Sequence, residues 1–158
     1  MVSRVFSAGL SGIDGYIVTV ECFLSGGLPR LDVVGLPTGA VSEAGERVRA
    51  AAKACAFDWP VSRLTVNLAP ADLPKESGRF DLPIALGILA ASGQINPEKL
   101  TQYEFAGELA LSGLLRPVRG ALAMAWQGMQ AGRSFVLPQE NAEQAAVMRG
   151  IAVYGARS

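Results

Sequence analysis

The middle of the chain shows its clearest alternation of apolar and polar residues. Three apolar residues, Leu64, Val66 and Leu68, are separated by single polar ones, a period of two that is typical of a half-buried strand. The stretch 80–92 is apolar at nearly every position, which predicts a helix buried on most sides. The segment 69–79 between them holds the densest run of charged and hydroxyl side chains. Because polar loops beside rigid elements often carry function, this segment is the first candidate site.

Three further strands are predicted before this central unit. Alternating patterns span 2–8 and 16–24, and their glycine-rich connector favours an antiparallel pair. A turn signal at 25–30 precedes a short apolar strand at 31–34. The three strands therefore predict a β-meander at the start of the fold.

An amphipathic helix is predicted after Pro37. Its apolar residues recur at intervals of three and four, and they are Val41, Ala44, Val48, Ala51 or Ala52, and Cys55. The charged residues lie off this stripe, and Glu43 precedes Arg47 by four residues. We interpret these charges as a solvated helix face, while a role for Arg47 and Arg49 in partner binding stays open.

The second half of the chain mixes short helices and strands. The predicted elements are a helical turn at 98–103, a hairpin from 105–111 and 114–118, a helix at 120–131 ended by Gly132, a strand at 135–137, a helix at 141–148 capped by Asn141, and a strand at 151–154. Strands come first, and helices and strands then alternate. This order predicts an α+β fold in which a mixed β-sheet packs against helices. The whole chain, 1–158, fits a single domain.

The composition removes several classes of chemistry. The sequence contains no histidine, which excludes histidine-based triads and removes the commonest metal ligand. Scattered carboxylates and two unclustered cysteines remain, so no metal site is expected. Cys22 and Cys55 fall in a predicted strand and a predicted helix, and both are expected to be core thiols.

Charge and hydropathy point to a cytoplasmic protein. Lys plus Arg and Asp plus Glu each total 14, so no global field recruits nucleic acid or an anionic membrane. The N-terminus lacks the apolar region of a signal peptide. The longest apolar run, 82–91, is too short to cross a bilayer, which needs about 20 apolar residues. We expect no membrane partner, and any nucleic-acid binding must use a local patch.

The sequence offers no phosphate-binding loop of its own. A Walker A motif requires Gly-Lys followed by Ser or Thr, and no Gly-Lys pair occurs. A Ser-Lys dyad is the hydrolytic option that needs no histidine, and Ser77 and Lys75 are its local candidates. They stand two residues apart on a loop, so the simpler interpretation is that both are solvated.

Four basic residues form a candidate binding surface. Lys75 and Arg79 belong to the polar loop, and Arg116 and Arg119 stand at the exit of the predicted hairpin. Gathered on one face, they would contact phosphates through charge and paired hydrogen bonds. The alternative is that they pair with neighbouring carboxylates. Those carboxylates are Asp72, Glu76, Asp81 and Glu108.

Several segments resemble one known family in sequence and in order. They are SRVFSAGLSGIDGYIVTVE at 3–21, VVGLPTGAVSEAGERVRAA at 33–51, VNLAPADLPKESGRFDLPIALGILAASGQI at 66–95, GELALSGLLRPVRGALAMA at 107–125 and VLPQENAEQA at 136–145. Together they strongly resemble the N-terminal domain of the ComM/YifB family of magnesium-chelatase-like AAA+ ATPases of bacteria. The resemblance covers nearly the whole chain and implies a domain that precedes an ATPase module. ATP and magnesium are expected for that missing module and not for this chain.

The domain that this chain resembles is similar to the proteolytic domain of Lon and to the C-terminal domain of RadA, which share a ribosomal protein S5 domain 2-like fold. Lon carries a nucleophilic serine at the start of the corresponding helix and a lysine after the following hairpin. Here Asp81 falls at the position of that serine and Leu122 at that of the lysine. A carboxylate cannot replace an activated hydroxyl, so no catalytic residue is expected. We interpret Asp81 as the N-cap of the buried helix.

The resemblance implies a supporting role in DNA processing. The family is associated with ATP-dependent branch migration of DNA during natural transformation, and the RadA domain serves in ring assembly and DNA contact. We therefore expect a non-enzymatic module of a hexameric homo-oligomer, with Lys75, Arg79, Arg116 and Arg119 as candidate DNA contacts. Two alternatives stay open: a residual Lon-class peptidase that uses Ser77, and a nucleotide or small-molecule site on an S5-like fold.

Overall fold

The computed structural model describes residues 2–11, 14–35, 37–71, 73, 75, 78–145 and 153–157. In chain order the strands are β1 (Val2–Ser11), β2 (Asp14–Ser25), β3 (Arg30–Val34), β4 (Arg63–Ala69), β5 (Tyr103–Phe105), β6 (Glu108–Leu109), β7 (Leu115–Arg116), β8 (Ser134–Pro138) and β9 (Val153–Ala156). The α-helices are α1 (Ala44–Ala54), α2 (Asp81–Ala91), α3 (Ala121–Gln130) and α4 (Gln139–Ala145). Short 3-10 helices are η1 (Gly39–Glu43), η2 (Gly78–Phe80) and η3 (Leu100–Gln102).

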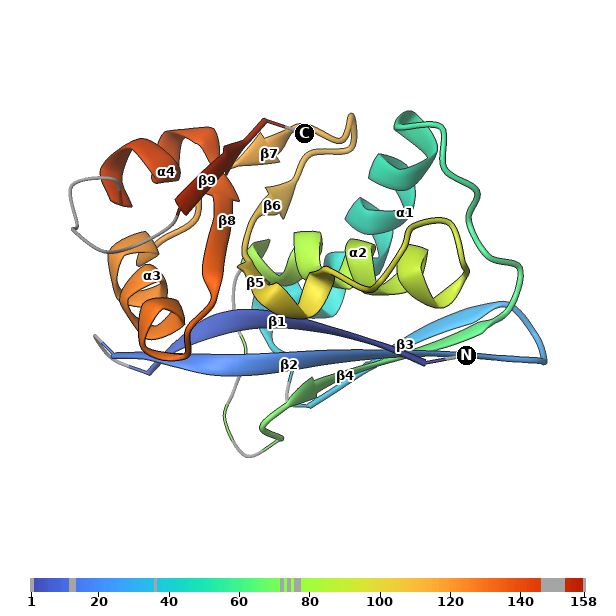
Figure 1. The fold of residues 1–158 in the computed structure, drawn as a ribbon. Coiled ribbons are helices and arrows are strands. Elements are labelled where there is room, and N and C mark those ends of the chain that lie inside the picture. Colours follow the sequence, from blue (N-terminus) through green and yellow to red (C-terminus); the bar gives the residue numbers. More distant parts are fainter. Residues whose placement is uncertain are drawn as a thin grey trace.

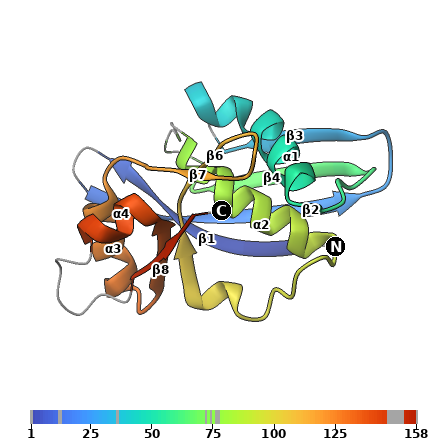
Figure 2. The same cartoon turned by 90° about the horizontal axis from the view of Figure 1, so that it is seen from above.

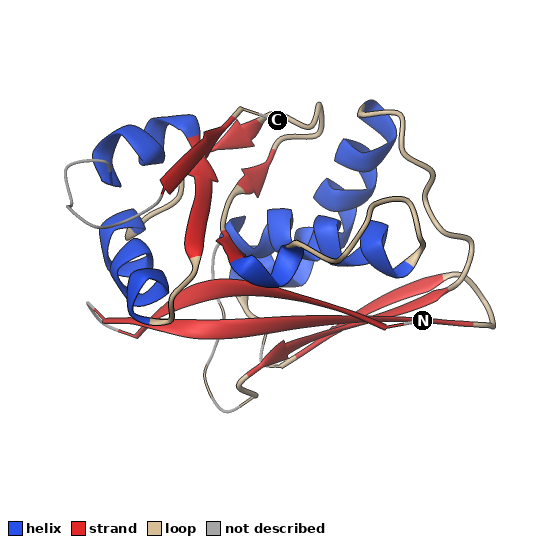
Figure 3. Cartoon of the chain, in the orientation of Figure 1, coloured by secondary structure: helices blue, strands red, loops and turns tan. Residues whose placement is uncertain are grey.

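A mixed sheet organises the fold. Within the described ranges, seven strands follow the order β3-β4-β2-β1-β5-β8-β9, and β6 and β7 form a separate hairpin. The pairs β1–β2 and β2–β4 are antiparallel. The other neighbours in the large sheet run parallel. Figure 3 shows the helices packed around these strands, so the predicted α+β class with a mixed sheet is confirmed.

Strand β3 corrects the predicted meander. It does not pair with β2, and instead runs parallel to β4, from Arg30 opposite Arg63 to Val34 opposite Asn67. Parallel neighbours cannot be joined by a tight turn and need a long crossover, which here contains α1. The resulting strand-helix-strand unit places β3 at one edge of the sheet (Figure 2).

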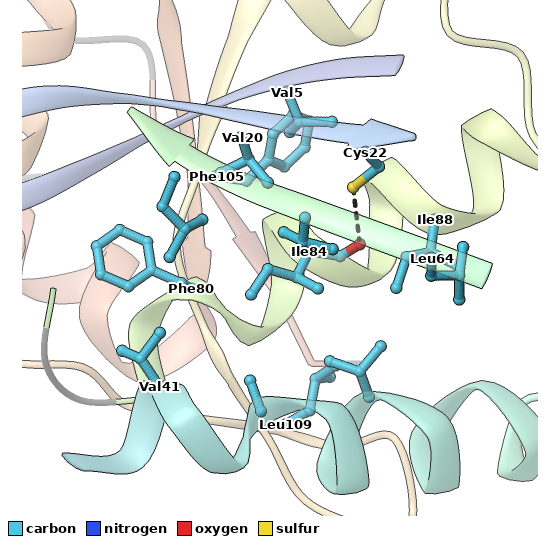
Figure 4. Close-up of a cluster of buried hydrophobic side chains, with 14 of the residues drawn as sticks. Val5, Val20, Cys22, Val41, Leu64, Phe80, Ile84, Ile88, Phe105 and Leu109 are labelled. Carbon is cyan, nitrogen blue, oxygen red and sulfur yellow. Dashed lines mark hydrogen bonds between the residues drawn. The ribbon is translucent and has the colours of Figure 1, made fainter. Parts of the chain in front are cut away.

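Helix α2 forms the centre of the main core. It is apolar on nearly all sides, as predicted, because the sheet lies against one side and α1 against another (Figure 1). Ile84 and Ile88 pack among residues such as Val5 of β1 and Leu64 of β4 (Figure 4). Cys22 is buried beside them, with its Sγ 4.0 Å from the carbonyl oxygen of Ile84. Burial raises the pKa of this thiol to about 12, which makes it unreactive near neutral pH.

The second cysteine does not join the core. Val48, Ala51 and Ala52 of α1 are buried, as the apolar stripe predicts, but Cys55 is exposed. Helix α1 ends at Ala54, and the chain turns away at Ala56, where φ is 66°. The expectation of a core thiol at Cys55 is therefore wrong, because Cys55 is the C-cap of α1 and lies on its exposed end.

Helices α3 and α4 cover the other end of the sheet. Met124 of α3 packs in a second cluster with Ala8 of β1 and Phe135 of β8. Val5 faces α2, whereas Ala8, three residues further along, faces α3. Since side chains alternate along a strand, α2 and α3 lie on opposite faces of the sheet. Figure 1 shows β8 running between them.

The C-terminal elements differ from prediction in two details. Phe105 belongs to β5 of the large sheet, so the hairpin is confined to β6 and β7. Helix α4 begins two residues earlier than predicted, which places Asn141 inside it. The Asn141 amide does not cap the helix; it accepts a hydrogen bond from Val118 N at 2.7 Å and donates one to Val118 O at 2.9 Å. The predicted positions 146–148 and 151–152 lie outside the described residues.

Gly132 allows a clean test of the backbone at the end of α3. It follows the C-cap with φ of 77°, as predicted for a glycine that ends a helix. A Cβ there would meet nothing within 4 Å, so Gly132→Ala tests the left-handed conformation alone. We expect a loss of about 1 kcal/mol in the free energy of unfolding, measured with urea. Gly26→Ala is the control, because Gly26 has open surroundings without a positive φ, and equal losses would contradict this explanation.

Candidate functional site

Two cations of the polar segment before α2 are buried. Lys75 is 1% exposed and Arg79 is 7% exposed. The carbonyl oxygen of Lys75 accepts hydrogen bonds from Thr38 N at 2.9 Å and Thr38 Oγ1 at 3.1 Å, which fixes the loop beside η1. The interpretation of Lys75 as a solvated residue is therefore wrong. Ser77, the other half of the candidate dyad, lies outside the described residues.

Asp81 opens α2 but does not cap it. The N-cap position belongs to Phe80, which makes no side-chain capping bond. The Asp81 carboxylate instead accepts two hydrogen bonds from Arg47, Nε to Oδ2 at 2.7 Å and Nη2 to Oδ1 at 3.0 Å. Leu109 N donates a third to Oδ2 at 3.1 Å. The predicted cap is thus a buried paired carboxylate that ties α1, α2 and β6 together.

Burial governs the electrostatics of this pair. The side chain of Asp81 is 1% exposed and that of Arg47 is 17% exposed. Burial raises the pKa of Asp81, and the hydrogen bonds from Arg47 and Leu109 offset part of that effect. The hydrogen bond to Asp81 raises the pKa of Arg47 in turn. The arrangement is the bidentate one in which arginine holds a carboxylate most strongly.

A short strap from Gly107 to Leu109 holds the start of α2 in place. Gly107 N donates to the carbonyl oxygen of Arg79 at 2.9 Å, and Leu82 N donates to the carbonyl oxygen of Gly107 at 3.0 Å. A Cβ at Gly78 would lie 2.6 Å from Cγ of Glu108, so any other residue there would require the Glu108 side chain to move. The strap satisfies backbone groups that a helix start leaves unpaired. It also carries Glu108 close enough to Asp81 to raise the pKa of that carboxyl.

Arg79 lies under the start of α3. Its Nη1 is 3.4 Å from the sulfur of Met124. Burial lowers the pKa of Arg79, the nearby Tyr16 phenol opposes that shift, and the charge of Arg119 adds to it. Burial likewise raises the pKa of Tyr16. The structure thus brings Arg79 and Arg119 together, with Arg79 inside and Arg119 outside.

Two of the four candidate DNA contacts face solvent. Arg116 in β7 and Arg119 in the turn before α3 are exposed, whereas Lys75 and Arg79 are buried. A buried cation cannot reach a phosphate outside the protein without a rearrangement of its loop. The structure therefore does not form one surface from all four residues. In this conformation, Arg116 and Arg119 are the two candidates of the four that are exposed enough to contact DNA.

Asp81 and Leu122, which the resemblance to Lon predicts at dyad positions, have different surroundings. Asp81 is buried and bound by three hydrogen-bond donors. Leu122 lies on α3 and is 44% exposed, with no group that can exchange a proton.

Sequence reasoning missed two charged partners. The spacing of Arg47 predicts a solvated helix face, and Glu104 falls between the predicted helical turn at 98–103 and the predicted strand at 105–111. Both are paired: Arg47 with Asp81, and Glu104 with Arg133 at 3.1 Å. The sequence gives only a weak signal that Arg47 pairs with Asp81, because Glu43, four residues before Arg47, already offers a partner. In the structure the side chains of Glu43 and Arg47 approach only to 3.9 Å.

The described residues contain no cluster of metal ligands and no membrane-spanning helix. No group of three or more His, Cys, Asp or Glu side chains in those ranges is placed to hold a metal ion. Over the same ranges, no helix has the length and apolar character required to span a membrane.

Comparison with known proteins relates the chain to longer bacterial proteins. A family model described as ChlI, subunit ChlI of Mg-chelatase, matches residues 20–141. The protein named YifB of Escherichia coli (strain K12) is 44% identical over 149 residues, which cover 94% of this chain and 29% of that protein. Competence protein ComM of Haemophilus influenzae is 46% identical over 154 residues, which cover 98% of this chain and 30% of that protein. Rv2897c of Mycobacterium tuberculosis is 39% identical over 158 residues, which cover 99% and 31%.

Proposed function

The chain belongs to the family of subunit ChlI of Mg-chelatase, with YifB and competence protein ComM as relatives, and we propose that it is a non-catalytic N-terminal domain of a magnesium-chelatase-like AAA+ ATPase. The domain aids assembly of a hexameric ring and contacts DNA in ATP-dependent branch migration during natural transformation. The chain spans 29–30% of the length of these relatives. The motor activity and the ring are therefore proposals about the longer protein.

The state of Asp81 is the observation that carries the non-catalytic assignment. A nucleophile or general base must reach a substrate, whereas Asp81 is buried and its oxygens are bound by Arg47 and by Leu109 N. Leu122 offers no acid-base group. We therefore propose that the reactive positions of a Lon-like domain have become packing positions in this chain.

A Lon-like, ribosomal protein S5 domain 2-like fold is part of the same proposal. Its support is the order of elements: an extended antiparallel pair, a strand-helix-strand unit, a polar loop, a buried helix, a hairpin and a further helix. The loop and the hairpin meet at the start of α2, through the strap at 107–109.

ATP and magnesium fit the proposed module outside this chain better than they fit the chain itself. The sequence contains no Gly-Lys pair for a Walker A loop. Its described carboxylates do not gather into a set that would hold a divalent cation. We assign no step of nucleotide chemistry to these residues.

The proposed DNA contact rests on Arg116 and Arg119. Both are exposed and close together in sequence, and Arg79 adds its charge beneath Arg119. Arg116 stands opposite Glu108 in the β6–β7 pair, which reduces its net field. The expected interaction is therefore weak and dependent on salt.

A charge-removal experiment tests this contact. Arg116→Gln with Arg119→Gln is expected to weaken binding of branched DNA and to lower the slope of log affinity against log salt by about 2, since each lost phosphate contact contributes about 0.9. Fluorescence anisotropy over a salt series measures both. The matched control is Arg49→Gln with Lys53→Gln, which removes two exposed cations from α1. Equal loss in the two variants would refute a local contact, and so would binding without any salt dependence.

A further inference from the structure

Strand β3 leaves one edge of the sheet open. It pairs with β4 on one side, and no strand of the described residues pairs with it on the other. Such an edge presents unpaired N–H and C=O groups that can add a further strand. Beside it lies a groove of about 560 Å³, between β3, helix α1 and the segment from Trp59 to Ser62.

The two faces of β3 differ in character. Leu31 and Val33 pair with buried positions of β4, face the helices and line the groove. Arg30 and Asp32 point to the opposite face, where Arg30 Nε donates to Asp32 Oδ1 at 2.8 Å. Arg63 Nη2 lies 3.7 Å from the other oxygen of Asp32. The strand thus carries one positive and one negative charge, two residues apart on one face.

Two copies of β3 that pair antiparallel can place each of these charges opposite a charge of the other sign. When Leu31 stands opposite the partner's Leu31, Arg30 stands opposite the partner's Asp32, and Asp32 opposite the partner's Arg30. In the same register Val33 stands opposite the partner's Pro29, so Leu31 and Val33 each face a residue that also lines the groove. Opposite charges across a strand pair are favourable, and like charges are unfavourable.

The neighbouring registers lack this match. A shift of two residues in one direction sets Asp32 against the partner's Asp32, and a shift in the other sets Arg30 against the partner's Arg30. A shift of one residue turns the partner's apolar side chains to the charged face. One register therefore satisfies both charge and burial.

We propose that a second copy of this chain adds its β3 antiparallel to this edge, with Leu31 opposite the partner's Leu31. The contact is isologous: both copies use the same patch, so each contact between two different residues occurs twice. It joins the two sheets into one and places apolar side chains of each copy beside the groove of the other. The proposal does not depend on the DNA contact at Arg116 and Arg119.

Reversing one charge at a time tests the register. Sedimentation equilibrium of this chain, from about 10 µM to about 1 mM for a weak interface, should show a reversible dimer. Arg30→Asp and Asp32→Arg should each weaken it by about tenfold or more, because every charge pair becomes repulsive. An equal mixture of the two variants should recover the wild-type affinity, since acidic and basic edges then meet. A monomeric wild type overturns the proposal, and so does a mixture that stays as weak as its components.

Cysteine cross-linking gives a second and independent measurement. In a Cys55→Ser background, Leu31→Cys should form a disulfide-linked dimer under mild oxidation, because opposed residues have Cβ atoms within about 5 Å. Val33→Cys is the matched control. In the proposed register Val33 stands opposite the partner's Pro29, so the two Val33 positions are four residues, or about 13 Å, apart along the strand and should not cross-link. Equal cross-linking at both positions, or at neither, contradicts the proposed register.

Discussion

Arg47→Ala is expected to lower the free energy of unfolding by about 3–5 kcal/mol, because it leaves a buried carboxylate without its counter-charge. Asp81 is 1% exposed, and two of its three hydrogen bonds come from Arg47. The remaining donor, Leu109 N, cannot balance a full charge. Burial then acts with less opposition and should raise the pKa of Asp81 further than it already does. Urea unfolding at pH 7 measures the loss.

The pH dependence separates this mechanism from a simple loss of packing. In the Arg47→Ala variant the unpaired carboxylate is the cause of the damage, so the deficit should shrink as pH falls and Asp81 becomes protonated. Adding Asp81→Asn should recover much of the loss at pH 7. Arg49→Ala is the control, since Arg49 is an exposed arginine on the same helix, and it should cost less than about 0.5 kcal/mol. A deficit that does not change with pH would show that the charge is not responsible.

Local patterns predicted most elements because their causes are local. The alternation at 64–68 produced β4, and the apolar stripe from Val41 to Ala52 faces the core. Helix α2 is hydrophobic on all sides since it lies between the sheet and α1. In these segments the buried and exposed faces are the ones that the hydrophobic period predicts.

The partner of β3 could not be read from the turn before it. The glycines and proline at 25–30 signal a reversal, and a reversal normally joins adjacent strands. Here α1 intervenes before β4, and the strand-helix-strand order gives a parallel pair. The choice between β2 and β4 as neighbour is a tertiary one, because β2 already has β1 on one side and β4 on the other.

The site was predicted in part. Arg79 does stand directly before the buried helix α2, but the sequence predicts the cations of this segment in solvent because charged side chains are rarely buried. Lys75 and Arg79 are buried since the loop is tied to Thr38 and to the strap at Gly107. The bond between Arg47 and Asp81 spans 34 positions in the sequence, and spacing carries no information about such a pair.

Glu104→Gln is expected to remove a pH-dependent loss of stability worth about 3 kcal/mol. Glu104 is fully buried; one oxygen accepts from Arg133 Nη1 at 3.1 Å, and Oε1 has no hydrogen-bond partner among the described residues. Burial raises its pKa from 4.5 to about 7. Between these values the folded state keeps a proton that the unfolded chain has lost, so the contribution of Glu104 to stability is fully present below about pH 4.5 and is lost as pH rises to about 7. A rise of the pKa from 4.5 to about 7 corresponds to about 3 kcal/mol of stability.

Urea unfolding of wild type and Glu104→Gln at a series of pH values between 5 and 8 tests this directly, because the difference between the two curves isolates one residue. The free energy of unfolding of Glu104→Gln should increase relative to that of the wild type as pH rises, and the difference should become constant above about pH 7. Arg133→Met adds a second check: Arg133 lowers the pKa of Glu104, so its loss should move the midpoint of the pH dependence to higher pH. Arg133 also lies over the Phe6 ring, 3.9 Å from its centroid, so this variant should lose stability at every pH as well. The shift of the midpoint, and not the overall loss, therefore decides the case. Parallel curves for all three proteins would show that Glu104 ionises without a penalty in the folded state.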